Sequence, residues 1–297
     1  MLAVAAPAAA PPGFEVLRWT APGAELAALT TQPATCLRDN SVNAQAGEAL
    51  FNSPNLLGGQ AAKAGLSCAS CHANGRDNPH FVMAGVSDAP GTADVTSSFF
   101  SAARGNGRFD PVIIPDLALP GKVSREPASG ALESFIRTLI VEEFAGQEPT
   151  PAMLGALATY VRSIGACAER DARTARGLDD QLDLIAAALH GASDMARRGD
   201  PVAARALVAA ARHQLGLIAE RYPMLRFRAE QRALLDASRG LQVLSGHSTD
   251  KEAFTTSATA WRASFDSGLA PRLRAKAPRS LYNPANLSFV APQQNNR

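Results

Sequence analysis

Apolar residues recur at helical spacing through the second half of the chain and predict four amphipathic helices. Residues three or four positions apart fall on one face of an α-helix, so each run of this kind can bury one side against its neighbours. The connections are short, as at 199–201, which favours antiparallel neighbours in a four-helix bundle or a pair of helical hairpins. Thr249 and Glu252 form a capping-box pattern that would begin the fourth helix. The apolar stripes are Leu178, Leu182, Ile185, Leu189 and Ala192; Leu207, Ala211, Leu215 and Ile218; Phe227, Leu234, Ala237, Leu241 and Leu244; and Phe254, Ala258, Trp261 and Phe265.

The first half of the chain predicts shorter helices separated by longer loops. Ser41 has the position of an N-cap, and Thr150 followed by Pro151 has the pattern of an N-cap and first helical residue. A further helix is expected over 131–144. Alternating β-branched runs are missing, so we expect no sheet beyond short hairpins in the loop that separates these helices. The residues expected on one helix face are Leu132, Ile136, Leu139 and Ile140, and then Leu154, Leu157, Val161 and Ile164.

These patterns predict an all-α chain in four parts. Residues 1–35 form an irregular leader rich in Pro and Ala, with a short helical patch at 24–30. Residues 36–170 form a compact domain, and 171–277 form the antiparallel helical bundle. An irregular tail at 278–297 completes the chain.

Composition and charge narrow the class of protein only a little. The 297 residues are 46% hydrophobic and 6% aromatic, which is ordinary for a globular protein. Residues 1–170 carry about −4 and residues 171–297 about +6, within a net charge of +2. This balance favours no class of partner, and we expect no nucleic acid. No run approaches the roughly 18 apolar residues of a membrane span, so we expect no transmembrane segment.

One short segment, Cys68-Ala69-Ser70-Cys71-His72, carries the chemistry. The spacing CxxCH is that of covalent c-type haem attachment, in which Cys68 and Cys71 form thioethers and His72 is the proximal iron ligand. A redox dithiol would need a strand–helix junction within a βαβ pattern, which is missing. A zinc site would need four ligands, and His80 is the one further donor nearby.

The surrounding residues resemble a c-type cytochrome domain, and within that class one half of the bacterial di-haem cytochrome c peroxidase family. The match covers about 36–167. The resemblance implies one covalently bound haem c. The segments that carry it are GEALF at 47–51, GLSCASCH at 65–72, GVS at 85–87, TSSFF at 96–100, GRFD at 107–110, EF at 143–144, PTP at 149–151, AL at 156–157 and YVRSI at 160–164.

The chain departs from that family in three ways. It has one CxxCH where the enzymes have two. The loop at 86–91 lacks the histidine that a family member would offer. The acid and amide side chains that assist peroxide cleavage are not found either. Arg104 and Arg108, in a Gly/Asn-rich loop, are candidates to hold the haem propionates through charge-assisted hydrogen bonds, or are simple surface arginines.

The ligand on the other face of the iron is expected just after the CxxCH. Residues 84–150 contain no methionine or histidine, which leaves Met83 and His80 as nearby donors. His80 lies 8 residues after His72 and can reach at most roughly 29 Å, whereas Met83 lies 11 residues on and can reach roughly 40 Å. Turns in the intervening 74–79 segment shorten that reach and favour Met83 over His80. An open site, or one completed by the bundle, is the alternative.

The two remaining cysteines, Cys36 and Cys167, are expected to form a disulfide. They are the two cysteines left once Cys68 and Cys71 are assigned to the haem, and the compartment is expected to be oxidising. They also precede the first and follow the last helix of the domain, and in c-type cytochromes these two helices cross. Two separate buried thiols are the alternative.

The leading functional hypothesis is an exported mono-haem c-type cytochrome that carries electrons to or from a redox partner protein or a membrane-associated redox complex. Two alternatives remain: a haem peroxidase or oxidase with an open distal site, and a structural haem-bearing subunit of a larger redox complex. We expect a periplasmic location, because haem attachment in this family takes place outside the bacterial inner membrane. The Ala- and Pro-rich start would then be a truncated or processed signal sequence.

Overall fold

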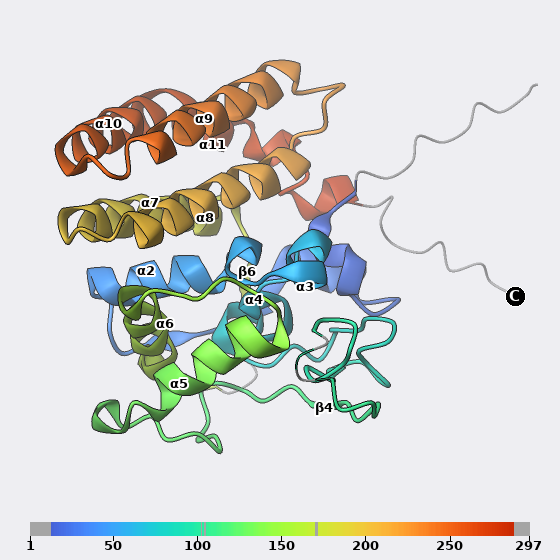
Figure 1. Ribbon diagram of the computed structural model, residues 1–297. Coiled ribbons are helices and arrows are strands. Elements are labelled where there is room, and N and C mark those ends of the chain that lie inside the picture. Colours follow the sequence, from blue (N-terminus) through green and yellow to red (C-terminus); the bar gives the residue numbers. More distant parts are fainter. Residues whose placement is uncertain (1–12, 102, 104, 170–171, 288–297) are drawn as a thin grey trace, which may run out of the picture.

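The chain is mostly helical in the computed structural model, which describes residues 13–101, 103, 105–169 and 172–287. This confirms the predicted all-α class. The main helices are α2 (Val42–Phe51), α5 (Ala131–Thr138), α6 (Pro151–Ser163), α7 (Leu178–Arg197), α8 (Pro201–Glu220), α9 (Arg228–Gly246), α10 (Lys251–Ser264) and α11 (Ala270–Lys276). Figure 1 shows α9, α10 and α11 in an upper layer, α7 and α8 beneath them, then α2, with α5 and α6 lowest.

The four predicted stripes of the second half are the packed faces of α7, α8, α9 and α10. All stripe residues of α7 and α8 are buried, and in α9 and α10 only Ala237 and Trp261 keep partial exposure. Helix α7 contacts α8 and α10, and α9 contacts α8 and α10, which closes a four-helix bundle. The predicted cap of α10 is wrong by one residue. Asp250, and not Thr249, accepts hydrogen bonds from the backbone N–H groups of Glu252 and Ala253.

The helices of the first half begin at the predicted caps. Ser41 Oγ accepts the backbone N–H of Ala44 at the start of α2, and Thr150 Oγ1 accepts that of Met153 at the start of α6. Both bonds satisfy donors that a helix N-terminus otherwise leaves unpaired. The helix expected over 131–144 is α5 continued by one π-helical segment, η5 (Leu139–Glu143).

Short elements fill the rest of the described chain, and both ends pack onto it. Phe14, Trp19 and Leu29 of the predicted leader are buried, and Leu281 and Leu287 of the predicted tail join Phe14 and Leu29 in a small apolar cluster. The remaining elements are η1 (Glu15–Trp19), α1 (Glu25–Thr30), η2 (Pro54–Leu56), α3 (Gly59–Ala64), α4 (Cys68–Cys71), η3 (Ala73–Gly75), η4 (Pro127–Ser129), η6 (Phe265–Leu269), η7 (Ala277–Arg279) and η8 (Pro284–Leu287).

Three two-stranded antiparallel ladders occur in the described residues, and the prediction of hairpins in the loop alone is wrong for two of them. Only the pair β3 (Thr92–Ala93) and β4 (Val112–Ile113) lies in that loop. The other two join segments that are distant in the sequence, one pair just inside the two ends of the predicted compact domain and one pair just outside them. They are β1 (Thr31–Pro33) with β6 (Arg173–Ala175), and β2 (Cys36–Leu37) with β5 (Ile164–Gly165).

One apolar core runs through all the layers. Buried side chains form a continuous cluster from α5 and α6 through α2 into the bundle. Helices α2 and α7 approach so closely that a Cβ at Gly191 would lie 2.6 Å from the Cβ of Ala46, so only glycine fits there. Helix α2 therefore connects the cores of the two predicted domains. Among the described helices, none combines the length and apolarity needed to cross a membrane.

Candidate functional site

The two cysteines of the CxxCH segment stand at the ends of a single helical turn. Ser67 and Ser70 cap this turn, since the backbone N–H of Ser67 donates to Ser70 Oγ at 3.0 Å. Within the described residues, Cys68 and Cys71 are free thiols. Removal from water raises the pKa of each to about 12. A redox dithiol needs the opposite shift, because the thiolate is its nucleophile.

His72 follows this turn and is held by a carbonyl from a distant loop. Its Nδ1 lies 3.1 Å from the carbonyl oxygen of Pro115, which can only accept, so Nδ1 carries the proton. Removal from water lowers the pKa of His72 to about 4, while backbone hydrogen bonds at Pro115 and Arg76 act in the opposite direction. The ring is therefore neutral at physiological pH, and in this tautomer the lone pair lies on Nε2, the atom through which such a histidine binds a metal.

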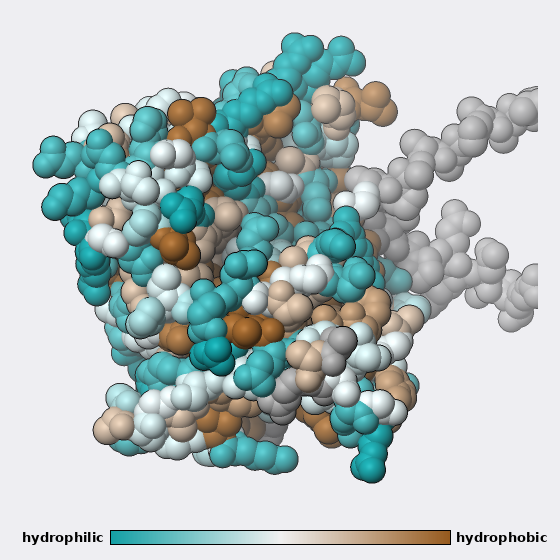
Figure 2. Space-filling view, viewed as in Figure 1, coloured by the Kyte–Doolittle hydropathy of each residue, from teal (hydrophilic) through white to brown (hydrophobic). Residues whose placement is uncertain are grey.

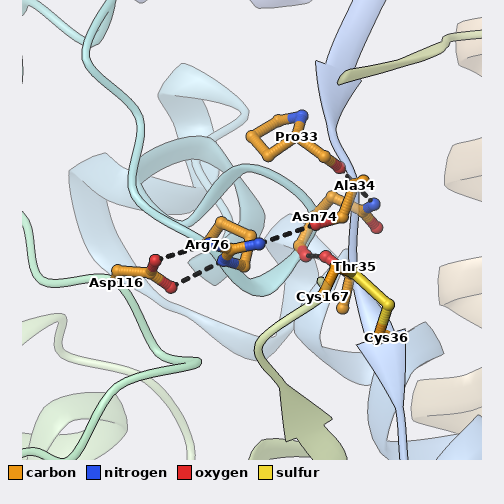
Figure 3. Close-up of a disulfide and its surroundings, with 8 residues drawn as sticks. All are labelled: Pro33, Ala34, Thr35, Cys36, Asn74, Arg76, Asp116 and Cys167. Atoms are coloured by element: carbon orange, nitrogen blue, oxygen red, sulfur yellow. Dashed lines mark hydrogen bonds and ion pairs between the residues drawn. A yellow bond between two sulfur atoms is a disulfide. The ribbon is translucent and has the colours of Figure 1, made fainter. Parts of the chain in front are cut away.

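A buried ion pair fixes the residue that follows Pro115. Arg76 donates to both carboxylate oxygens of Asp116 at 2.7 and 2.8 Å, and the two side chains are only 2% and 5% exposed. Arg76 also donates to the carbonyl of Ala34 at 2.7 Å. The pair thus joins the segment after His72 to the segment whose Pro115 carbonyl accepts the hydrogen bond of His72. Figure 3 shows Arg76 with its bonds to Asp116 and Ala34.

The predicted disulfide between Cys36 and Cys167 is confirmed, with Cα atoms 5.3 Å apart. Beside it, the chain just before Cys36 binds the segment after His72. Thr35 Oγ1 donates to the carbonyl of Asn74, and Asn74 Nδ2 donates to the carbonyl of Pro33 at 2.8 Å. The disulfide therefore holds in place the segment 33–36, to which the loop after the CxxCH is hydrogen-bonded (Figure 3).

Helices α2 and α6 cross closely above this site. A Cβ at Gly47 would lie 2.0 Å from the carbonyl oxygen of Ala156, so the crossing requires glycine. One turn further on, the ring of Phe51 packs edge-on against Tyr160 at 5.2 Å and lies 6.3 Å from the ring of His72. The predicted crossing of the first and last helices of the compact domain is confirmed.

The two candidates for the second iron ligand have different surroundings. Met83 is partly buried against the main apolar cluster, as are Cys68 and Cys71. His80 lines a small cavity together with Arg173, and burial and that arginine lower the pKa of His80.

The predicted propionate ligands receive no support from the structure. Arg104 lies outside the described residues. Arg108 is exposed, and its backbone N–H donates to the side chain of Asn106. Sequence reasoning missed the residues that position His72, namely Pro115, Arg76 and Asp116. The one available signal was the presence of an arginine and an aspartate of opposite charge, which is too common to single out.

Apolar side chains are exposed along the chain just before Pro115. Val112 and Ile113, which form β4, are 64% and 80% exposed, and Phe109 is 57% exposed. Figure 2 shows brown, hydrophobic residues at the surface in the lower right, around the place of β4 in Figure 1. Exposed large apolar groups in a cluster are typical of contact surfaces.

In the part of the chain that the structure describes, no group of three or more His, Cys, Asp and Glu side chains could hold a metal ion. No protein-family model, curated protein or solved structure matches the chain.

Proposed function

We propose that this chain is an exported mono-haem c-type cytochrome that transfers electrons to or from a partner protein. The observation that carries the proposal is the placement of His72, whose Nδ1–H donates to the carbonyl of Pro115 and which directly follows the helical turn that carries the free thiols of Cys68 and Cys71. An imidazole held in this tautomer by a backbone carbonyl presents Nε2 to a metal.

The residues present fit a covalently attached haem. Cys68 and Cys71 would hold it through thioethers at the two ends of α4, and His72 would be the first axial ligand. The rival explanations fit less well. The raised pKa of both thiols disfavours a redox dithiol, and a structural zinc ion would need a fourth ligand. When bound, the haem would supply reversible one-electron chemistry.

The protein would then supply rigidity and ligand orientation. The Arg76–Asp116 pair holds the loop that carries Pro115, and the disulfide holds the strand to which Arg76 donates. This support keeps the imidazole in one tautomer and one orientation. Electron transfer benefits from such rigidity, because less reorganisation accompanies the change of iron charge.

Met83 is our proposed second axial ligand, in preference to His80. Its side chain is packed against apolar groups, whereas His80 lines a cavity beside Arg173. A thioether ligand would raise the reduction potential, which suits an electron carrier.

A partner would dock near the exposed apolar residues Phe109, Val112 and Ile113, two residues or more before Pro115. Electron transfer between proteins needs only a modest interface, and a small apolar patch beside the redox centre provides one. The disulfide is compatible with the oxidising compartment that export implies.

The test is a visible spectrum of the exported, purified protein in its ferric and ferrous states. We expect one haem per chain by pyridine haemochrome, retained after denaturation, and a low-spin ferric spectrum. Met83→Ala should convert the spectrum to high-spin, while His80→Ala and the exposed control Met224→Ala should leave it low-spin.

Other results would select an alternative. No haem in the wild type would refute the proposal as a whole. A wild-type spectrum that is already high-spin, with rapid reaction of the haem with hydrogen peroxide, would favour the peroxidase or oxidase. Purification at fixed stoichiometry with other chains, without electron exchange, would favour a structural subunit.

A further inference from the structure

The turn between α8 and α9 carries two aliphatic side chains into solvent at one end of the helical bundle. Met224 is 54% exposed and Leu225 is 89% exposed, and no other large apolar side chain of the described residues is as exposed as Leu225. Figure 2 shows brown, hydrophobic residues that project at the upper right, where this turn lies in Figure 1. Single exposed apolar side chains are normal, but two adjacent ones on a projecting turn present a contact surface.

Buried residues on both sides hold this turn in place. Tyr222 and Phe227 are 0% and 5% exposed, and their rings pack edge-on with centroids 5.2 Å apart. The hydroxyl of Tyr222 donates to the carbonyl of Leu273 at 2.8 Å. The backbone N–H groups of Arg226 and Phe227 both donate to the carbonyl of Pro223 at 3.0 Å. The backbone of the turn is therefore fixed, and its two aliphatic side chains project from a preformed support.

Two exposed arginines, Arg226 and Arg228, follow the turn directly. The carboxylate nearest to them in the sequence is that of Glu230, and it pairs with two other cations. Lys276 Nζ lies 2.6 Å and Arg272 Nε 3.6 Å from Glu230 Oε1. Within the described part of the chain, no ion pair includes Arg226 or Arg228. Both guanidinium groups are therefore left to bind a group outside the chain.

The segment 272–279 brings further positive charge to the same end of the bundle. It contains four basic side chains and no acidic one. Two contacts place it beside the turn. One is the hydrogen bond of Tyr222 to Leu273, and the other is the backbone N–H of Leu281, which donates to the carbonyl of Arg221 at 2.9 Å.

The charges at this end of the bundle do not balance. Six basic side chains lie there, and among the described residues two carboxylates pair with them: Glu230, and Asp179 at 2.7 Å from Arg274 Nε. Four positive charges therefore remain uncompensated, and they produce a positive potential around the aliphatic pair. The six are Arg226, Arg228, Arg272, Arg274, Lys276 and Arg279.

We propose that this end of the bundle binds the surface of an anionic phospholipid bilayer. Met224 and Leu225 would enter the boundary between headgroups and acyl chains, while the basic side chains around them bind lipid phosphates. Cations near an anionic bilayer add to the binding that the buried apolar area provides.

A bilayer fits this surface better than an acidic protein does. Two aliphatic side chains on a projecting turn bury much less area against a flat protein surface than a stable protein interface needs. Lipid headgroups, by contrast, move aside around an inserted side chain. Five of the six cations are arginines, and the planar guanidinium binds phosphate oxygens through paired hydrogen bonds.

This binding would leave the other proposed contact surface accessible. In Figure 1 the turn lies at the top of the molecule, whereas β4 lies near the bottom. A chain bound to a bilayer through the turn therefore keeps the exposed residues of β4 free for a protein partner.

The test is cosedimentation of the full-length purified protein with vesicles of phosphatidylglycerol and phosphatidylcholine in equal parts. We expect binding to these vesicles at low salt, weaker binding at high salt, and little binding to phosphatidylcholine alone. Leu225→Gln should lower the partition coefficient about tenfold, because the transfer of one leucine side chain out of water is lost. The double substitution Arg226→Gln/Arg228→Gln should lower it about 30-fold, because each cation near an anionic surface contributes about fivefold.

Two exposed residues at the other end of the bundle provide matched controls. Val243 on α9 is 65% exposed and lies about 22 Å along the helix from Arg228. Arg198 precedes α8, whose 20 residues span about 30 Å between it and the turn. Val243→Gln and Arg198→Gln should leave the partition coefficient unchanged. All these side chains are exposed, so the variants should fold, and far-ultraviolet circular dichroism checks this.

Three outcomes would overturn the proposal. The absence of cosedimentation would do so, and would leave an acidic protein as the partner that this surface fits. Equal losses in Leu225→Gln and Val243→Gln would show that the turn is not the contact. Undiminished binding of Leu225→Gln would reduce the interaction to charge alone. Cosedimentation follows total protein and not haem, so the result is independent of the proposed cytochrome function.

Discussion

Removing the disulfide should destabilise the chain by an amount that its position allows us to calculate. The bond between Cys36 and Cys167 spans 131 residues. In the chain-entropy model, closing a loop of this length lowers the entropy of the unfolded state and stabilises the protein by about 5 kcal/mol. Because one apolar core runs through the whole structure, we treat unfolding as a single transition. For 297 residues, a loss of this size lowers Tm by about 8 °C.

The variant is the double substitution Cys36→Ser/Cys167→Ser. Single substitutions would leave a thiol able to pair wrongly with Cys68 or Cys71 during export. The assay is thermal unfolding followed by far-ultraviolet circular dichroism, alongside the wild type with its disulfide reduced. The hydrogen bonds from Thr35 and Asn74 remain in the double variant, so its folded structure should persist.

A Tm within about 2 °C of the wild type would refute the loop-closure argument for this chain. A double variant with the stability of the wild type but an altered haem spectrum would instead show that the disulfide positions the site and does not act by reducing the entropy of the unfolded state.

Three further predictions follow from buried contacts. Gly47→Val should lower the free energy of unfolding by about 3 kcal/mol or more, at the upper end of overpacking effects, because α2 and α6 must separate to admit the side chain. Urea unfolding measures this loss, and a loss below about 1 kcal/mol would contradict the close crossing of the two helices. Asp116→Asn should cost about 3–5 kcal/mol, because Arg76 keeps its buried charge and loses its carboxylate; equal stability would argue against the pair. Glu48 has its folded pKa raised from 4.5 to about 7, so the folded state binds the extra proton and stability falls as pH rises between these values. Glu48→Gln should remove on the order of 2–3 kcal/mol of that fall, and parallel stability–pH curves for the two proteins would contradict it.

The sequence by itself determined the helices, because their signals are local. Apolar spacing and caps such as Ser41 and Thr150 act within a few residues, and the structure places helices at these positions. The error at Thr249 has the same origin, since adjacent Thr249 and Asp250 can both cap and only the final backbone selects one. The disulfide followed from counting four cysteines, of which two already had a predicted role.

Only the tertiary structure decided how the site is held and what lies beside it. His72 is 43 residues from Pro115, and β1 pairs with β6 across more than 140 residues, separations at which no local pattern specifies a partner. The Arg76–Asp116 pair joins two loops 40 residues apart, and the contact of α2 with α7 depends on the close approach of Gly191 to Ala46. Local propensity sets the elements, whereas packing across the chain sets which polar groups are removed from water together.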